Sequence, residues 1–336
     1  MRTLIFILSA ISFLLFTTCD EENPISANFS NGLRSIKLYN LDNKAVNKIQ
    51  DINSPVYDCV FVDSTYFSYA SFYSGLAELI VRDLRSYNYY DFYKGGGIPI
   101  SGIQMYPESE SIFFAADAIY LVKEYGKLVS KLANGVSPVF NPVTNVVMYS
   151  FWNNSTDYMI ISQNLGTTSI DTLLKVGGKF LTLYFIKEDG SHLIYTEYDF
   201  SSGGLITLKS INLLNLNDIK FLTNPISSVR IGKNKSVNDK VAYVSEGTVY
   251  VLDLNAADLI PIATNAQFAD ISKDGQKVVY TTESELYTAN SDGTNKQTLV
   301  NKTNENKYLF LPSFSSNDEQ IVFIESHYKY GFDYEL

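Results

Sequence analysis

The fold can be read from one stretch, Gln267-Phe-Ala-Asp-Ile-Ser-Lys-Asp-Gly-Gln-Lys-Val-Val-Tyr-Thr-Thr-Glu-Ser-Glu-Leu-Tyr-Thr-Ala-Asn-Ser-Asp-Gly-Thr-Asn-Lys-Gln-Thr-Leu299. Asp274-Gly275 and Asp292-Gly293 supply the positive φ angles that tight turns need. Runs rich in β-branched and aromatic residues lie between and beside these turns. The first predicted strand ends at Ile271. The other three span Lys277 to Thr281, Glu285 to Ala289 and Lys296 to Leu299. The stretch therefore predicts a four-stranded antiparallel meander.

This stretch resembles the TolB-like (PD40/WD40-like) β-propeller repeat, whose pattern runs F-S-P-D-G, I-A-F, I-Y, D-G and L-T. The matching positions are Ser272-Lys-Asp-Gly275, Val278-Val-Tyr280, Leu286-Tyr287, Asp292-Gly293 and Thr298-Leu299. Lys273 stands where the family has proline. The resemblance implies an all-β propeller built from such meanders. It also implies a role as an interaction platform, which propellers of this family commonly have.

A second strand with an aromatic residue near its end recurs in degenerate form along the chain. The aromatic markers are Tyr69, Phe114, Tyr149, Tyr195, Tyr243, Tyr280 and Phe323. Successive markers are separated by 45, 35, 46, 48, 37 and 43 residues, which centre on the roughly 40–45 residues of a propeller blade. The pattern predicts a β-propeller of seven four-stranded antiparallel blades, with six or eight blades as alternatives.

The two ends of the propeller each supply half a blade. The segment from Leu33 to Ile52 has the pattern of a third and fourth strand. Pro312 to Asp318 and Gln320 to Ile324 have the pattern of a first and second strand. Joining these halves would remove the unpaired sheet edges of an open ring. We therefore expect a mixed closing blade in a single domain that spans 33–336.

The N-terminus has the composition of an export signal. Arg2 precedes an apolar run from Leu4 to Phe16 that is too short to span a bilayer. The run ends in Thr17-Thr18-Cys19, which resembles a bacterial lipoprotein signal, although that family prefers Leu at the place of Phe16 and Gly or Ala at the place of Thr18. The resemblance implies a signal peptide over 1–18 and lipid on the sulfur of Cys19. An ordinary secretory signal is the alternative.

Acidic residues follow directly, in Asp20-Glu21-Glu22-Asn23-Pro24. Such a run cannot bury a core, so we expect a solvated tether over 19–32. Acids beside a lipidated cysteine resemble the surface-export signal of Bacteroidota lipoproteins. The resemblance implies a protein anchored by lipid in the outer membrane and displayed at the cell surface. A plain spacer that leaves the protein facing the periplasm is the alternative.

The charge of the chain excludes some partners. Lys and Arg number 26 against 36 Asp and Glu, which gives a net charge of −10. Losing Arg2 with the signal would leave −11. Such a surface repels phosphate backbones, so we expect no nucleic-acid partner, and we expect a monomer. Cys59 would remain without a cysteine partner, and it is expected to be a buried small hydrophobe.

Recognisable catalytic motifs are missing from the sequence. His192 and His327 have no other His or Cys at ligand spacing, so we expect neither a metal site nor a cofactor. Gly-x-Ser-x-Gly and a phosphate-binding glycine loop are absent. We therefore assign no catalytic residue. Acidic residues of different blades can still meet at the mouth of a central channel, which keeps an enzyme open as an alternative.

One aromatic stretch stands out as a candidate binding patch. Its members are Tyr87, Tyr89, Tyr90, Phe92 and Tyr93. They are dense enough to form a stacking platform for sugar rings or a docking patch for a protein. An outer strand packed between blades is the alternative.

The sequence thus predicts a non-catalytic, lipid-anchored platform of the cell envelope that binds a protein, peptide or glycan. The alternative is a carbohydrate-active or other hydrolytic enzyme with acids at the channel mouth.

Overall fold

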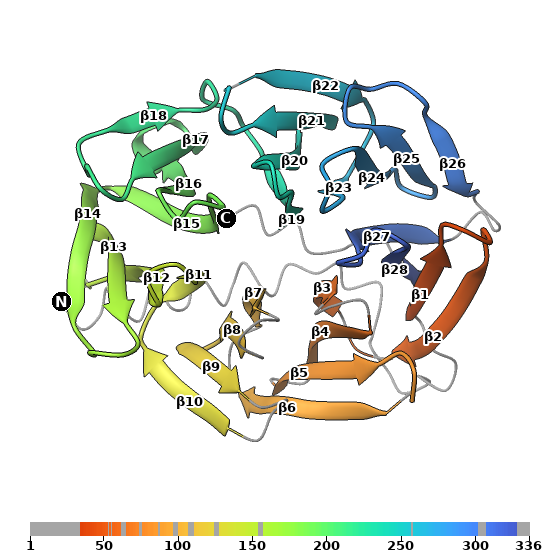
Figure 1. Ribbon diagram of the computed structural model, residues 1–336, viewed down its shortest axis with the longest axis horizontal. Coiled ribbons are helices and arrows are strands. Elements are labelled where there is room, and N and C mark those ends of the chain that lie inside the picture. Colours follow the sequence, from red (N-terminus) through yellow and green to blue (C-terminus); the bar gives the residue numbers. More distant parts are fainter. Residues whose placement is uncertain are drawn as a thin grey trace. The chain divides into compact units, whose positions relative to one another are not determined.

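In the computed structural model, the described residues form seven four-stranded antiparallel sheets arranged as the blades of a propeller (Figure 1). These residues are 34–52, 54, 56–61, 65–73, 76–86, 88–96, 100–106, 111–123, 128–153, 157–256, 258–301 and 307–327. The predicted fold class and blade number are confirmed. The predicted signal peptide over 1–18, Cys19 and the tether over 19–32 lie outside these residues and stay predictions.

The first three blades follow the chain from the innermost strand to the outermost. Blade 1 contains β3 (Val56–Phe61), β4 (Tyr66–Tyr73), β5 (Leu76–Asp83) and β6 (Tyr89–Gly96). Blade 2 contains β7 (Ser101–Tyr106), β8 (Ser111–Ala115), β9 (Ile119–Lys123) and β10 (Leu128–Ala133). Blade 3 contains β11 (Val136–Asn141), β12 (Val146–Trp152), β13 (Asp157–Asn164) and β14 (Ile170–Gly177).

The next three blades repeat this order. Blade 4 contains β15 (Lys179–Ile186), β16 (His192–Asp199), β17 (Leu205–Asn212) and β18 (Ile219–Phe221), with the short helix η3 (Phe200–Ser202) between β16 and β17. Blade 5 contains β19 (Arg230–Lys235), β20 (Lys240–Ser245), β21 (Thr248–Asp253) and β22 (Leu259–Ala263). Blade 6 contains β23 (Phe268–Ile271), β24 (Lys277–Thr281), β25 (Leu286–Asn290) and β26 (Gln297–Val300).

Blade 7 joins the two ends of the ring, as predicted. Its strand order is β27 (Tyr308–Phe314), β28 (Gln320–Ser326), β1 (Arg34–Asn40) and β2 (Val46–Ile52). The first strand begins earlier than the sequence suggested, because Ser315 to Asp318 form its turn. In that turn Ser315 Oγ accepts a hydrogen bond from the amide of Gln320, and Asp318 has a φ of 58°.

The core lies between neighbouring blades. Each of the seven predicted aromatic markers lies on the second strand of its blade, and each is at most 4% exposed. Phe323 of blade 7 packs in one cluster with Val279 of blade 6. Tyr69 of blade 1 packs in another with Val322 of blade 7. The markers are therefore periodic because every blade needs a large ring against the next blade.

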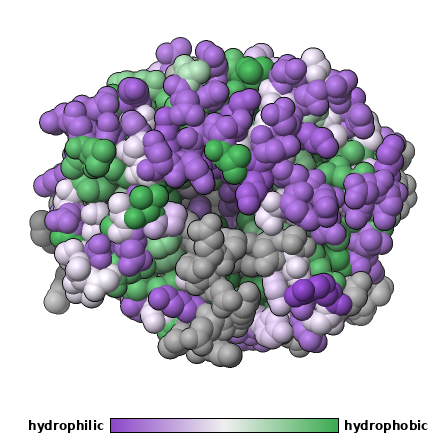
Figure 2. Space-filling model, viewed as in Figure 1, coloured by the Kyte–Doolittle hydropathy of each residue, from purple (hydrophilic) through white to green (hydrophobic). Residues whose placement is uncertain are grey.

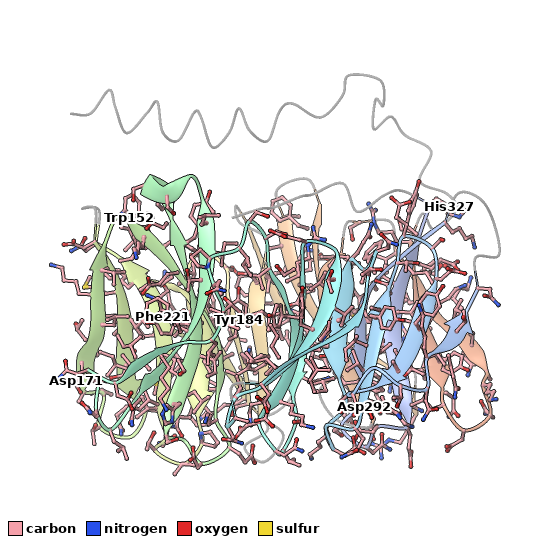
Figure 3. The ribbon with its side chains drawn as sticks, turned by 90° about the horizontal axis from the view of Figure 1, so that it is seen from above. Trp152, Asp171, Tyr184, Phe221, Asp292 and His327 are labelled. Carbon is pink, nitrogen blue, oxygen red and sulfur yellow. The ribbon has the colours of Figure 1, made fainter. Side chains whose placement is uncertain are left out.

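The ring has two different faces. The upper face carries the connections from the second to the third strand of each blade. Trp152 and His327 lie on this face in Figure 3. The lower face carries the turns from first to second and from third to fourth strands, and Asp171 and Asp292 lie there. The lower face is turned to the viewer in Figure 2 and is largely hydrophilic. None of the described residues belong to a helix with the length and apolarity of a bilayer span.

Candidate functional site

The centre of the ring is where an enzyme of this shape would gather carboxylates. The first strands of the blades surround it (Figure 1). Asp58 of β3 is buried and forms an ion pair with Lys233 of β19, with Nζ 2.8 Å from Oδ1. Gln104 of β7 donates a hydrogen bond of 3.2 Å to the carbonyl of Tyr184 on β15. Both contacts join blades that are not neighbours, so these polar groups already have partners within the protein.

Asp270 is a second carboxylate of the inner strands. It is fully buried on β23 and accepts hydrogen bonds from the amides of Asn234 on β19 and Phe314 on β27, at 2.8 and 3.0 Å. Burial raises the pKa of Asp270 to about 6, although these hydrogen bonds act in the opposite direction. Asp270 therefore connects three inner strands. Among the described residues, no three His, Cys, Asp or Glu side chains lie together as a metal site would need.

Aromatic side chains, some exposed and some half-buried, gather instead on the upper face of blades 3 and 4. We call this set the aromatic surface, and its members are Trp152, Tyr158, Phe180, Tyr198 and Phe200. The rings of Trp152 and Tyr158 stack with centroids 6.1 Å apart and planes at 14°. Tyr158 meets Phe180 of the next blade edge-on at 5.3 Å, and Tyr198 meets Phe200 edge-on at 4.9 Å. The surface thus continues from one blade to the next.

Strand pairing positions these rings. Trp152, the last residue of β12, lies opposite Tyr158 on β13, and Phe180 on β15 lies opposite Tyr198 on β16. Trp152 is 51% exposed and Phe200 is 58% exposed, whereas the other three rings are half-buried. The half-buried rings are held by packing and support the exposed ones. An exposed aromatic group of this kind commonly marks a binding surface.

The backbone beside Tyr198 is adapted to the surface. Asp199 caps η3, since its Oδ1 accepts a hydrogen bond of 2.9 Å from the amide of Ser201. Gly203 and Gly204 follow the helix, and their φ angles of 80° and 82° favour glycine. A Cβ on Gly204 would lie 2.6 Å from the hydroxyl of Tyr198. Glycine is therefore required here if the Tyr198 ring is to keep its place.

Charged groups border the aromatic surface. Asp157 pairs with Lys175 at 2.8 Å, and Lys179 lies 3.1 Å from Glu197 and 3.7 Å from Asp199. Hydrogen bonds from Ser201, and the charge of Lys179, lower the pKa of Asp199. At neutral pH this rim therefore offers ionised carboxylates, which accept hydrogen bonds from hydroxyl groups.

The candidate patch on β6 divides in the structure. Tyr87 and the side chain of Tyr89 lie outside the described residues. Tyr90 is 40% exposed, and Phe92 is buried in the cluster between blades 1 and 2. Tyr93 is half-buried and packs against two rings of blade 2. Phe92 and Tyr93 thus pack between blades, which agrees with the alternative of a packed outer strand. A binding role for this stretch stays a prediction.

The reactive side chains considered from the sequence lie far apart in the chain and on different blades. Cys59 is buried and forms no disulfide with another described residue, and burial raises the pKa of its thiol. The expectation of a buried small hydrophobe is confirmed. His192 Nδ1 lies 2.6 Å from Ser191 Oγ in a turn of blade 4, and burial lowers the pKa of His192. His327 is exposed at the end of β28.

The sequence analysis missed the aromatic surface, although a signal for it exists. Trp152 and Tyr198 each follow an aromatic marker, Tyr149 or Tyr195, by three residues. That spacing carries an aromatic ring to the upper end of the second strand in two successive blades. The spacing marks Trp152 and Tyr198 but not the other three rings of the surface, and Phe72 follows Tyr69 by the same three residues in blade 1.

No protein-family model and no curated protein matches the chain. Solved structures do match. An oligogalacturonate lyase from Vibrio parahaemolyticus has a TM-score of 0.62 at 10% identity, over 87% of this chain and 96% of the other. An oligogalacturonate lyase in complex with manganese has a TM-score of 0.61 at 13% identity, over 89% and 92%. A putative TolB from Agrobacterium tumefaciens has a TM-score of 0.51 at 15% identity, over 87% and 98%. At these identities the likeness shows a shared propeller fold alone.

Proposed function

We propose that this protein is a non-catalytic binding platform of the cell envelope, anchored through lipid on Cys19, that holds a glycan on the aromatic surface. The observation that carries the proposal is the exposed stack of Trp152 on Tyr158 with carboxylates at its border. The apolar face of a sugar ring fits a flat aromatic ring. The sugar hydroxyls would then reach Asp157 and Asp199. A net charge of −10 disfavours a polyanionic glycan, which favours a neutral glycan as the ligand.

The test uses the emission of Trp152, which is the one tryptophan in the sequence. The full chain is screened on a glycan array, and each hit is titrated while tryptophan emission and heat of binding are measured. We expect saturable emission changes. Trp152→Ala should weaken binding at least about fivefold, because loss of an aromatic anchor commonly costs more than about 1 kcal/mol.

Leu214→Ala is the matched control, since Leu214 is an 89% exposed side chain on a lower-face turn of blade 4. This variant should bind as the wild type does. Binding of a peptide or protein that Trp152→Ala abolishes would keep the surface and change the ligand class. Full binding by Trp152→Ala would refute the aromatic surface as the site.

The lipid anchor has its own test. Cys19→Ala removes the sulfur that would carry the lipid, so the variant should move from the detergent phase to the aqueous phase when cells are extracted. Metabolic labelling with a fatty acid should mark the wild type and leave the variant unlabelled. A variant that still enters the detergent phase would show that the anchor lies elsewhere.

A carbohydrate-active enzyme is the second candidate. The likeness in fold to two oligogalacturonate lyases favours it. The described carboxylates at the centre favour a structural role, because Asp58 and Asp270 are already bound by groups of other inner strands. Turnover of oligogalacturonate by the purified chain would support the enzyme and contradict a non-catalytic platform.

A further inference from the structure

A pocket of about 210 Å³ opens between blades 6 and 7, far from the aromatic surface. It involves β24, β25 and β26 on one side, and β1 with its following turn on the other. The polar residues that line it are Tyr39, Lys44, Lys277, Thr288, Asn290, Asn295 and Gln297. We call it the seam pocket, because β1 is the N-terminal strand that closes the ring.

The charged residues that line the seam pocket, Lys44 and Lys277, are both basic. None of the lining residues is acidic. Within the described part of the chain, the ammonium groups of Lys44 and Lys277 have neither an ion pair nor a hydrogen bond. Both lysine residues are exposed. Two unpaired ammonium groups at one pocket attract an anion.

Neutral donors complete the lining. The side chains of Asn295 and Gln297 make no hydrogen bond with other described residues, so their amide groups are free to donate. Burial raises the pKa of Tyr39, so its hydroxyl stays protonated at neutral pH. Leu41, Ala289 and Leu299 add apolar surface. A ligand with one anionic group, hydroxyls and a small carbon skeleton satisfies all of these groups together.

We propose that the seam pocket binds a small organic anion, of which a sugar acid is the best-fitting class. Its volume of about 210 Å³ exceeds that of a few waters but is below the roughly 300–1,000 Å³ of pockets for drug-sized ligands. A monosaccharide acid fits this range and an oligomer does not. The ligand would contact Lys44 of blade 7 and Lys277 of blade 6, and so would link the N-terminal strand pair to the preceding blade.

The test compares D-glucuronate with D-glucose, which lacks the carboxylate, and with inorganic phosphate. Binding to the full chain is measured by calorimetry and by the unfolding temperature. We expect glucuronate to bind and to raise the unfolding temperature, because a ligand of the folded state stabilises it by mass action. Glucose should do neither. Added salt should weaken the binding.

The double variant Lys44→Gln/Lys277→Gln should lose at least about tenfold in affinity for glucuronate. Lys123→Gln is the control, because Lys123 is an exposed lysine of blade 2. Phosphate binding without glucuronate binding would assign the pocket to phosphorylated ligands and keep the anion site. Equal affinity in the double variant, or failure of both anions to bind, would overturn the proposal. Neither result bears on glycan binding at the aromatic surface.

Discussion

At the scale of single residues, Asp270 is a buried carboxylate that connects strands although burial disfavours its charged form. The carboxylate accepts hydrogen bonds from blades 5 and 7 while it lies on blade 6. Its pKa of about 6 means that burial penalises the charged form more than these hydrogen bonds favour it. Asp270 therefore gives the inner strands their connection and makes the stability of the ring depend on pH.

The direction of this dependence follows from the two pKa values. The pKa of Asp270 is about 6 in the folded chain and about 3.9 in an unfolded one. The stability from its protonated form is therefore complete below about pH 4 and is lost as the pH rises through 6. Asp270→Asn should remove this component, on the order of 2 kcal/mol between pH 4 and 7. Urea unfolding at a series of pH values measures it.

Asp171→Asn is the control, because Asp171 is exposed at the outer edge of blade 3. Its pH profile should follow the wild type. The absolute stability of Asp270→Asn is a poor readout, since an amide cannot accept all of the hydrogen bonds that the carboxylate accepts. The slope with pH is the readout, and an unchanged slope in Asp270→Asn would contradict the assignment.

At the scale of strands and turns, local chemistry determines much of what the sequence predicted correctly. The strands of blade 6 match the prediction closely, because Asp-Gly turns and β-branched runs fix their ends.

A second sequence repeat marks the end of the third strand in most blades. Asn or Asp followed by Leu begins the turn after the third strand in five blades, at Asn40, Asp83, Asn164, Asn212 and Asp253. Each of these side chains accepts hydrogen bonds from two amides of its turn.

Other elements escaped prediction because they depend on contacts between strands. A bulge opposite Leu79 and Ile80 inserts Phe92 into β6, so Phe92 and its neighbour Tyr93 both pack inward, against the simple alternation of a strand. The aromatic surface depends on the contact of Tyr158 with Phe180 across two blades. No spacing within one blade reveals such a contact. The candidate site was therefore less predictable than the fold.

Turns of the lower face also join successive blades in ways that the sequence conceals. Asp318 in the first turn of blade 7 accepts hydrogen bonds of 2.7 and 3.0 Å from the amides of Lys273 and Asp274 in the first turn of blade 6. Asp239 of blade 5 accepts one of 2.9 Å from the amide of Glu188 in blade 4. Both aspartates have φ near 58°, where blade 6 has Gly275 instead. Their carboxylates offset the strain of that conformation by binding the adjacent blade.

At the scale of the whole molecule, stability depends on closure of the ring. Strand β1 pairs with β28 along its full length, from Arg34 opposite Ser326 to Asn40 opposite Gln320. Ile36 and Leu38 are buried in the cluster that blade 7 shares with blade 1. Residues at opposite ends of the chain thus form one sheet and one core. The two ends should therefore unfold together with the rest of the ring.

Removal of the N-terminal strand pair tests this cooperativity. A chain that starts near Asn53 lacks β1 and β2, exposes the edge of β28 and uncovers apolar side chains of blades 1 and 7. Its free energy of unfolding should be several kcal/mol lower than that of a chain that starts near Ser30. This is a large share of the ~5–15 kcal/mol typical of a folded domain. Thermal melts of the two chains measure the loss.

A peptide covering 30–52, added to the shortened chain, should raise its midpoint temperature of unfolding, because the peptide can pair with β28. The same peptide with Ile36→Asp and Leu38→Asp should leave the midpoint temperature unchanged. Equal midpoints for the two chains would mean that the ring is stable without its closing strands.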